Sequence, residues 1–238
     1  MTDETPFSGK LALVTGASRG IGAATAEALA AAGAHVILVA RTSSDLEQVE
    51  ERIHDAGGSA TIAPLDLTDG SGIGKLATAV AERWAKLDIL VLNAATLGTL
   101  TPVQDIDPKE YARLLTLNVG ANQALIAAFD PLLRQADRAD VIAMTSSVGA
   151  EPRAFWGAYG SSKAALESLL GAYADETEHT GRIRVHIVNP GATRTKMRER
   201  AYPGEDPNTL KSPEVVAQHI VDRLTADVPT GEKVRVDA

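Results

Sequence analysis

The sequence predicts an α/β fold in which one doubly wound parallel sheet carries helices on both of its faces. Short, nearly continuous apolar runs alternate along the chain with amphipathic segments of helical length, which is typical of parallel strands buried on both faces. The 238 residues contain no linker or low-complexity tract between these units. We therefore expect a single domain over residues 1–238 with about seven strands.

Six apolar runs predict the first strands, and glycines mark the ends of several intervening helices. The predicted strands are LALVT (11–15), HVILVA (35–40), SATIAPL (59–65), DILVLN (88–93), DVIAMTS (140–146) and RVHIVNP (184–190). The predicted helices span 20–33, 43–56, 69–86, 107–136 and 157–178. After Pro190, closely spaced glycines and prolines exclude a long regular element, and we interpret residues 191–211 as a mobile substrate lid. A helix over 213–225 and a short strand, KVRVDA, complete the domain.

Composition excludes several classes of function. The 23 basic and 31 acidic residues give a net charge of −8, which disfavours a nucleic-acid partner. The absence of cysteine excludes disulfides, thiolate metal ligands and a cysteine nucleophile, and the five histidines have no metal-ligand spacing, so we expect no metal site. The segment MTDETPFSGK lacks the apolar core of a signal peptide, and no apolar run is long enough to cross a bilayer. We expect a cytoplasmic protein with no membrane partner.

The stretch TGASRGIG, residues 15–22, puts Gly16, Gly20 and Gly22 where the first predicted strand is followed by the first helix. Glycine reaches backbone angles that other residues avoid and lets a ligand approach the main chain closely. The amides of the turn and the positive end of the helix dipole face one point, which suits a pyrophosphate. The alternative is that the glycines only permit a tight turn and close helix packing. In its strand-turn-helix context the motif favours dinucleotide binding and hence a Rossmann fold.

Arg41 indicates which dinucleotide is bound. About 20 residues beyond the glycine turn, such a site presents the side chain that meets the adenosine ribose. A carboxylate there would repel the 2′-phosphate of NADP, whereas the guanidinium of Arg41 can pair with it. We therefore expect NADP(H), with NADPH preferred over NADH. The alternative is that Arg41 is a solvated strand end.

Tyr159 and Lys163, in AYGSSKAAL, lie four residues apart on a predicted helix, so both side chains project from one face. A cation about 4 Å from the phenol, at an effective dielectric of about 20, contributes about 4 kcal/mol and would lower the tyrosine pKa from about 10 toward the working pH. Ser146 ends the fifth predicted strand, where side chains face the ligand crevice of a parallel sheet. The spacing alone could be that of ordinary surface residues; together with Ser146 it indicates a proton-transfer site.

These motifs resemble those of the short-chain dehydrogenase/reductase family, over nearly the whole chain and most closely a bacterial subgroup of NADP-dependent oxidoreductases of unassigned substrate. The resemblance implies hydride transfer between NADP(H) and a carbonyl or alcohol substrate, with Tyr159 as general acid/base and Ser146 as the hydrogen-bond donor to the substrate oxygen. It further implies that Lys163 lowers the tyrosine pKa and holds the nicotinamide ribose, and that Asn118 holds a water beside the lysine. Ser147 is one residue closer to Tyr159, but the spacing favours Ser146.

The resemblance also assigns cofactor-binding residues. It directs Arg19 to the same 2′-phosphate as Arg41, Asp66 to the adenine edge, residues 93–95 to the adenosine ribose, and Thr193 and Thr195 to the nicotinamide carboxamide. The full expected set is Gly16, Ser18, Arg19, Gly20, Ile21, Gly22, Arg41, Asp66, Leu67, Asn93, Ala94, Tyr159, Lys163, Pro190, Gly191, Thr193 and Thr195. Thr96 departs from the family, which more often has glycine there, and leaves the backbone path of that loop open.

Several residues near the predicted site allow two interpretations. An aromatic and sulfur-containing set could wall a substrate pocket or pack in the core: Phe155, Trp156, Met197 and Tyr202. A basic set in the lid could recruit an anionic ligand or form a solvated face: Arg194, Lys196, Arg198 and Arg200.

The resemblance leaves two alternative functions and implies an oligomer. One alternative is a 3-oxoacyl thioester reductase of the same family; the other is a non-catalytic dinucleotide-sensing protein, against which Ser146, Tyr159 and Lys163 argue. By analogy, the helices over 107–136 and 157–178 pair across a dimer axis, so we expect a homodimer or homotetramer.

Overall fold

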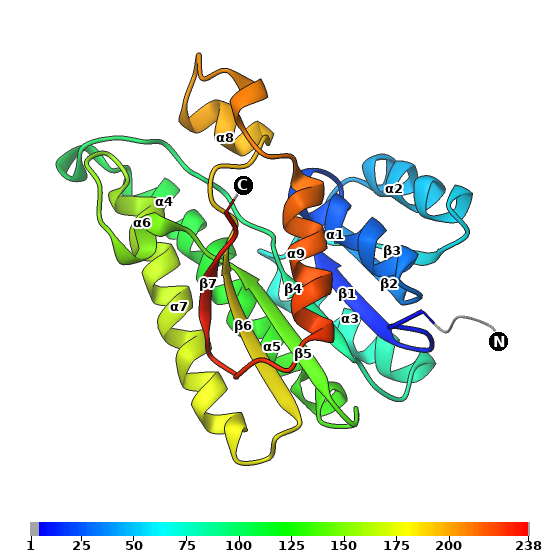
Figure 1. Ribbon diagram of the computed structural model, residues 1–238. Helices are drawn as coiled ribbons and strands as arrows, with labels where there is room; N and C mark the ends of the chain where they lie inside the picture. Colours follow the sequence, from blue (N-terminus) through cyan, green and yellow to red (C-terminus); the bar gives the residue numbers. More distant parts are fainter. Residues whose placement is uncertain (1–4, 238) are drawn as a thin grey trace.

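The computed structural model describes residues 5–237 and contains one sheet of seven parallel strands (Figure 1). The strands are β1 (Leu11–Thr15), β2 (His35–Ala40), β3 (Ser59–Pro64), β4 (Ile89–Leu92), β5 (Ala139–Met144), β6 (Ile183–Asn189) and β7 (Lys233–Arg235). Their order is β3-β2-β1-β4-β5-β6-β7, and every neighbouring pair is parallel. The predicted doubly wound sheet is confirmed. Its order reverses between β1 and β4, which is where such sheets bind ligands.

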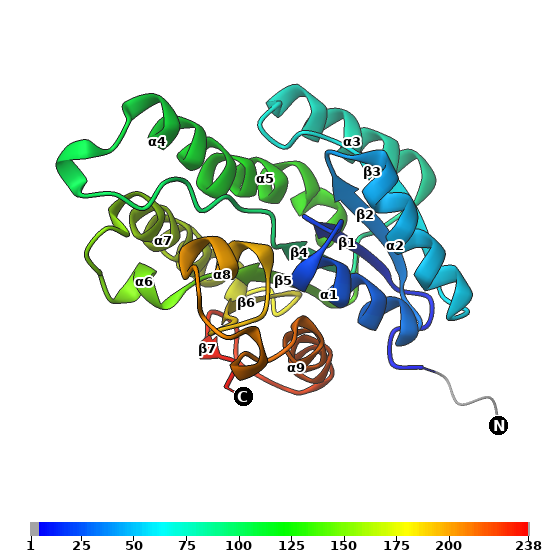
Figure 2. The same cartoon turned by 90° about the horizontal axis from the view of Figure 1, so that it is seen from above.

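The long helices form two layers, one on each face of the sheet (Figures 1 and 2). The first layer contains α1 (Gly20–Ala31), α2 (Ser43–Asp55) and α9 (Pro213–Thr225), and the second contains α3 (Gly70–Arg83), α5 (Ala121–Leu133) and α7 (Gly157–Glu178). Within β1, Leu11 and Leu13 belong to the core of the second layer, whereas Ala12 and Val14 belong to the first. Successive side chains thus enter two separate cores, which explains the continuous apolar runs of the sequence.

The segment predicted as one helix over 107–136 is divided. It consists of α4 (Pro108–Leu115), the π-helical turn η2 (Thr116–Gly120) and α5, which ends at Leu133. A π turn contains one residue more than an α turn and interrupts the regular hydrogen-bond ladder. The apolar pattern did not reveal it because Leu114, Leu117 and Ala121 keep the spacing of three and four residues that a continuous helix would have.

The predicted lid contains short elements. Within residues 191–211, α8 (Lys196–Ala201) and the 3-10 turn η3 (Pro207–Thr209) form, and an isolated bridge joins Thr193 to Lys211. Seen from above, α8 lies between α7 and α1 (Figure 2). The mobility of this segment stays a prediction. Two further short elements are the 3-10 turn η1 (Val103–Asp105) and the helix α6 (Ser147–Ala150).

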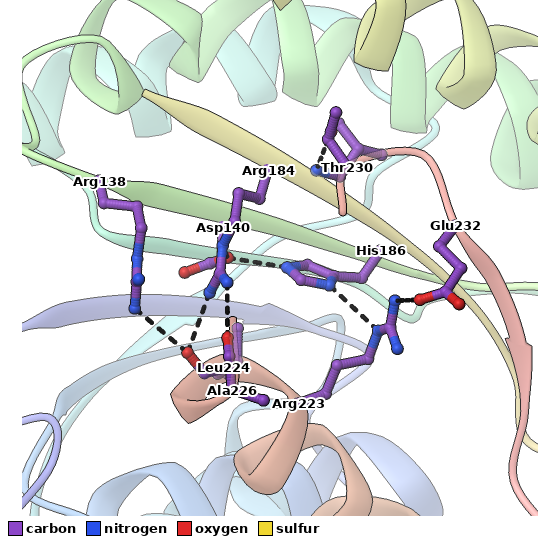
Figure 3. A network of polar contacts seen from close by, with 10 residues as sticks. Arg138, Asp140, Arg184, His186, Arg223, Leu224, Ala226, Thr230 and Glu232 are labelled. Atoms are coloured by element: carbon purple, nitrogen blue, oxygen red, sulfur yellow. Dashed lines mark hydrogen bonds and ion pairs between the residues drawn. The ribbon is translucent and has the colours of Figure 1, made fainter. Parts of the chain in front are cut away.

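A network of polar contacts fixes the C-terminal part of the chain to the sheet (Figure 3). Asp140 of β5 accepts hydrogen bonds from Arg184 at 2.8 Å and from His186 Nε2 at 2.7 Å, both on β6. Arg223 of α9 donates to His186 Nδ1 at 3.2 Å and pairs with Glu232 at 2.5 Å. Because Glu232 immediately precedes β7, the network holds the last strand beside β6.

Within residues 5–237, no helix has the length and apolarity that a membrane span requires.

Candidate active site

The glycine turn joins β1 to α1 and leaves no room for a side chain at Gly16 or Gly22. Gly16 and Gly20 have φ angles of +65° and +57°, in the left-handed region that favours glycine. A Cβ at Gly22 would lie 2.2 Å from the carbonyl oxygen of Gly16. No side chain caps the first turn of α1, and that turn contains no acidic residue. Its amide groups are therefore suited to an anionic ligand.

A pair of polar side chains at the ends of β1 and β4 supports this turn. The hydroxyl of Thr15 donates to the carbonyl oxygen of Val91 at 3.0 Å and accepts from the amides of Asn93 and Ala94 at 3.0 and 3.1 Å. Asn93 Nδ2 donates to the carbonyl oxygen of Thr15 at 2.9 Å and to that of Gly16 at 3.4 Å. The Asn93 side chain thus contacts the back of the turn. Sequence reasoning did not single out Thr15, although a buried hydroxyl at the end of an apolar strand is the signal for it.

The two arginines predicted to bind the 2′-phosphate are exposed. Arg19 is the residue before α1, and Arg41 follows β2. Neither has an ion-pair partner among residues 5–237. Asp66, beyond β3, accepts hydrogen bonds from the amide and hydroxyl of Thr68 at 2.9 and 2.8 Å. These bonds lower the pKa of the Asp66 carboxyl, and the nearby guanidinium of Arg41 lowers it further. The adjacent Leu67 is buried in the second-layer core.

Tyr159 and Lys163 lie in the first turns of α7, and both are buried, with 7% and 2% of their surfaces exposed. Lys163 Nζ donates to the carbonyl oxygen of Met144 at 2.8 Å and lies 5.7 Å from the centroid of the Tyr159 ring. The hydroxyl of Tyr159 points to Met197 Sδ at 4.0 Å. The two side chains therefore share one face of the helix, as the spacing predicted.

The pKa shifts differ from the expectation for this pair. Burial raises the pKa of the Tyr159 phenol above its ordinary value, instead of the lysine lowering it. Burial lowers the pKa of Lys163 to about 8, an effect that Glu167 partly opposes. Lys163 Nζ donates to the Met144 carbonyl oxygen and lies beside the ring, and desolvation is the cause of the raised Tyr159 pKa.

Ser146 and Ser147 lie where the chain passes from β5 into α6. Ser146 is the residue that precedes α6, is partly exposed, and makes no side-chain capping bond. Ser147 is the first residue of α6 and is also partly exposed. The choice of Ser146 over Ser147 stays a prediction.

Asn118 lies inside the π turn η2 and is fully buried. Its Oδ1 accepts from the amide of Thr96 at 2.8 Å, and its Nδ2 donates to the carbonyl oxygen of Thr96 at 2.9 Å and to Ser162 Oγ at 3.0 Å. The side chain therefore determines the path of the loop at Thr96 and links it to α7. Ser162, which sequence reasoning did not assign, also donates to the carbonyl oxygen of Tyr159 at 2.7 Å. The water-holding role of Asn118 stays a prediction.

The segment after β6 approaches the glycine turn. A Cβ at Gly20 would lie 3.5 Å from Cγ2 of Thr195, the residue that caps α8. The hydroxyl of Thr193 donates to the carbonyl oxygen of Pro190 at 3.0 Å. Gly191 has a φ of +63° and is packed against Lys211. The start of α1 and the start of the lid, which are far apart in sequence, thus lie side by side.

An apolar cluster surrounds the Tyr159 side chain. Its buried members are Leu97, Val148 and Tyr159, and Leu100, Trp156, Met197 and Ala201 pack against them. Trp156 contacts Tyr159 edge-on at 6.0 Å and Tyr202 at 5.7 Å between ring centroids. Of the four residues considered as pocket walls, Phe155 is 56% exposed and lies outside this cluster.

One of the four basic lid residues is already paired. Arg198 forms a two-bond ion pair with Glu205, both at 2.6 Å, and its guanidinium lies 3.7 Å from the centroid of Tyr202. Arg194, Lys196 and Arg200 are exposed. Among residues 5–237, no group of three or more histidine, aspartate or glutamate side chains is arranged to hold a metal ion.

Known proteins are similar to this chain in sequence and fold. The model of the family described as short chain dehydrogenase matches residues 10–206. The uncharacterized oxidoreductase YciK of Escherichia coli K12 is 39% identical over 207 residues, which cover 86% of this chain and 81% of YciK.

Two solved structures with a bound dinucleotide are also similar. A short chain dehydrogenase from Shigella flexneri 2a complexed with NADP has a TM-score of 0.93 and 35% identity, over 98% of this chain and 99% of its own. One from Escherichia coli CFT073 complexed with NADPH has a TM-score of 0.92 and 35% identity, over 99% and 100% of the two chains.

Proposed function

The chain belongs to the short-chain dehydrogenase/reductase family, and on this premise we propose that it is an NADP(H)-dependent oxidoreductase that interconverts a carbonyl compound and its alcohol. The observation that carries the proposal is the common location of two features. A lysine-tyrosine pair on α7 and a glycine turn at the start of α1 both border the lid segment, through Met197 and Thr195 respectively.

The glycine turn fits a pyrophosphate. Glycine at positions 16 and 22 permits close packing of the turn against Asn93, and the amides at the start of α1, which no side chain caps, are the donors that a pyrophosphate would use. Arg19 and Arg41 would hold the 2′-phosphate, and the exposed Asp66 would meet the adenine edge. A phosphate with nearly two negative charges gains more from two guanidinium groups than a neutral ribose hydroxyl does. We infer that NADPH binds more tightly than NADH.

When bound, the cofactor supplies the hydride, and the chain's own residues manage the proton. Tyr159 donates its phenolic proton to the carbonyl oxygen during reduction and removes it during alcohol oxidation. Ser146, which follows β5, donates a hydrogen bond to the same oxygen as negative charge develops on it. Lys163, whose ammonium lies beside the Tyr159 ring, would hold the nicotinamide ribose.

The surroundings of Tyr159 favour a carbonyl with apolar substituents. Leu97, Val148, Trp156 and Met197 present no charged group to the phenol, and the lid residue Arg198 is neutralised by Glu205. A carboxylate beside the carbonyl would find no cation in this cluster and would lose its hydration. The 3-oxoacyl thioester alternative needs a basic surface for its carrier protein, and it becomes one member of the substrate panel.

We also propose a homodimer or homotetramer in the cytoplasm. On family analogy the helices over 107–136 and 157–178, which correspond to α4, α5 and α7, form the interface, and Leu169 of α7 is 38% exposed. Light scattering after size-exclusion chromatography tests this part separately, and a monomer at micromolar concentration contradicts it.

Fluorescence titration with NADPH and with NADH tests the proposed function. We expect saturable binding of NADPH with a Kd at least about tenfold lower than that of NADH, followed by NADPH oxidation with some member of a panel of apolar ketones, apolar aldehydes, keto acids and 3-oxoacyl thioesters. Binding of neither dinucleotide contradicts the proposal. Binding without turnover of any carbonyl favours the sensing alternative.

A further inference from the structure

Glu167 is a buried carboxylate in the same helix as the Tyr159–Lys163 pair. It is 6% exposed and lies one helical turn beyond Lys163 on α7, so the three side chains at 159, 163 and 167 follow one another along a face of the helix. Acidic side chains are almost never fully buried without a partner. The polar groups that compensate Glu167 therefore indicate its role.

Two groups hold this carboxylate, and each comes from a different strand. Thr145, the residue after β5, hydrogen-bonds Oε1 through its hydroxyl. Lys233, the first residue of β7, donates to Oε2 at 2.8 Å. Gly149 of α6 also lies against it, since a Cβ there would be 3.0 Å from Oε1. The carboxylate is thus fixed between α7 and the carboxyl end of β5.

The same end of β5 also holds the lysine. Met144, next to Thr145, accepts the hydrogen bond from Lys163 Nζ, and Ser146 follows. Lys163 and Glu167 make no direct ion pair among the described residues, and the carboxylate acts on the ammonium through its field. Burial lowers the pKa of Lys163, and the negative charge of Glu167 is the effect that raises it again.

We propose that Glu167 is a positioning residue that keeps Lys163 protonated at the pH of catalysis, with Lys233 of β7 holding the carboxylate in place. The value of a protonated Lys163 for turnover rests on the proposed function, whereas the electrostatic effect itself does not. The C-terminal strand thereby contributes to the reaction through the contact of Lys233 with Glu167.

Among residues 5–237, Glu167 is the one carboxylate whose charge acts on Lys163. Tyr159 and Lys163 share its helix, Lys233 faces it from β7, and Tyr111 of α4 contacts α7 through Ser161. The neighbours contributed by β5, α6 and η2 are uncharged: Met144, Thr145, Gly149 and Asn118. On the face of β6 toward α7, the residues are Ile183, Val185 and Ile187.

A purely structural role would give different results. If Glu167 only anchors β7 to α7, its removal weakens folding and lowers activity equally at all pH values. If it supports the charge of Lys163, its removal changes the pH at which Lys163 loses its proton. The titration of Lys163 therefore separates the two roles.

The direct test is an NMR titration of lysine side chains labelled with ¹³C at Cε, recorded on the protein without cofactor. The Lys163 signal is assigned by its loss in Lys163→Met. We expect a midpoint near 8 in the parent protein, and a midpoint lower by about one to two pH units in Glu167→Gln, because one charge is removed a helical turn away at an effective dielectric of about 20. Glu178→Gln, an exposed carboxylate at the end of the same helix, is the matched control and should leave the midpoint unchanged.

Lys233→Gln should not lower the titration midpoint of Lys163. It removes a cation near Glu167 without removing the carboxylate, so the Lys163 midpoint should stay or rise, and this variant also serves if Glu167→Gln does not fold. An unchanged midpoint in Glu167→Gln, or a lowered one in Lys233→Gln, overturns the proposal.

Turnover gives an independent readout: the basic limb of kcat/KM for carbonyl reduction should move to lower pH in Glu167→Gln, with activity near pH 6 largely kept. A chain without any reductase activity would disprove the proposed function but not the titration result.

Discussion

Replacing Lys163 with methionine tests whether the protein buries a charge at the expense of stability. The side chain is 2% exposed, and its pKa falls from 10.5 to about 8. Because each pKa unit corresponds to about 1.4 kcal/mol, the charged form costs about 3 kcal/mol of folding free energy at neutral pH. Methionine avoids this cost but leaves the Met144 carbonyl without its donor, which costs about 1–2 kcal/mol. We expect Lys163→Met to be more stable by about 1–2 kcal/mol at pH 7, and inactive.

The stability difference between Lys163→Met and the parent protein should also depend on pH. The folded-state pKa of Lys163 lies below the unfolded one, so between about pH 8 and 10.5 the unfolded chain holds more protons. The free energy of unfolding of the parent protein therefore increases with pH between about pH 8 and 10.5, and Lys163 adds no such increase below pH 8. The advantage of Lys163→Met should shrink from pH 7 to pH 10.

Urea unfolding followed by circular dichroism at pH 7 and pH 10 measures both effects. Lys109→Met, at an exposed position of α4, is the matched control and should change stability little at either pH. A Lys163→Met protein that is less stable than its parent at pH 7, or whose stability difference is the same at both pH values, refutes this reasoning.

Three further substitutions test other parts of the account. Arg41→Asp should lower the ratio of kcat/KM for NADPH to that for NADH by at least about tenfold, since it replaces an attraction for the 2′-phosphate with a repulsion; an unchanged ratio contradicts the assignment. Gly22→Ala should abolish NADPH binding, because its Cβ would lie 2.2 Å from the Gly16 carbonyl oxygen; Gly74→Ala, with open space around it inside α3, should instead stabilise the fold by about 0.5–1 kcal/mol in thermal unfolding. Met197→Ala should raise KM for apolar carbonyls while leaving the Kd of NADPH unchanged, and an unaltered KM would exclude Met197 from the substrate wall.

Local sequence patterns were sufficient for the sheet and for the strand-turn-helix context of the glycine motif, whereas the assignment of the site stays a prediction. The parallel sheet follows from apolar runs whose alternate residues enter two cores, as in β1. The glycine turn requires backbone angles that glycine adopts more easily than other residues, as at Gly16 and Gly20. The pairing of Tyr159 with Lys163 follows from helical spacing. Each of these features depends on residues close together in the chain.

Features that depend on distant residues could not be predicted. The π turn at Asn118 is stabilised by the loop at Thr96, 22 residues earlier, and keeps the apolar spacing of an ordinary helix. The ion pair between Glu167 and Lys233 joins residues 66 positions apart. Burial raises the pKa of Tyr159 in this arrangement, because helical spacing gives proximity on one face but does not reveal the desolvation of a phenol packed against Trp156 and Met197. The lowering of this pKa by Lys163 stays a prediction.

Proton donation by the phenol of Tyr159 is the central step of the proposed reaction, and Tyr159→Phe removes that single oxygen. NADPH affinity and NADPH oxidation should be measured on the same preparation, with a carbonyl substrate of the parent protein. We expect a Kd for NADPH within about twofold of the parent value and a kcat lower by at least about 1,000-fold. A variant that binds NADPH normally and retains more than about a tenth of the parent kcat contradicts the assignment of Tyr159.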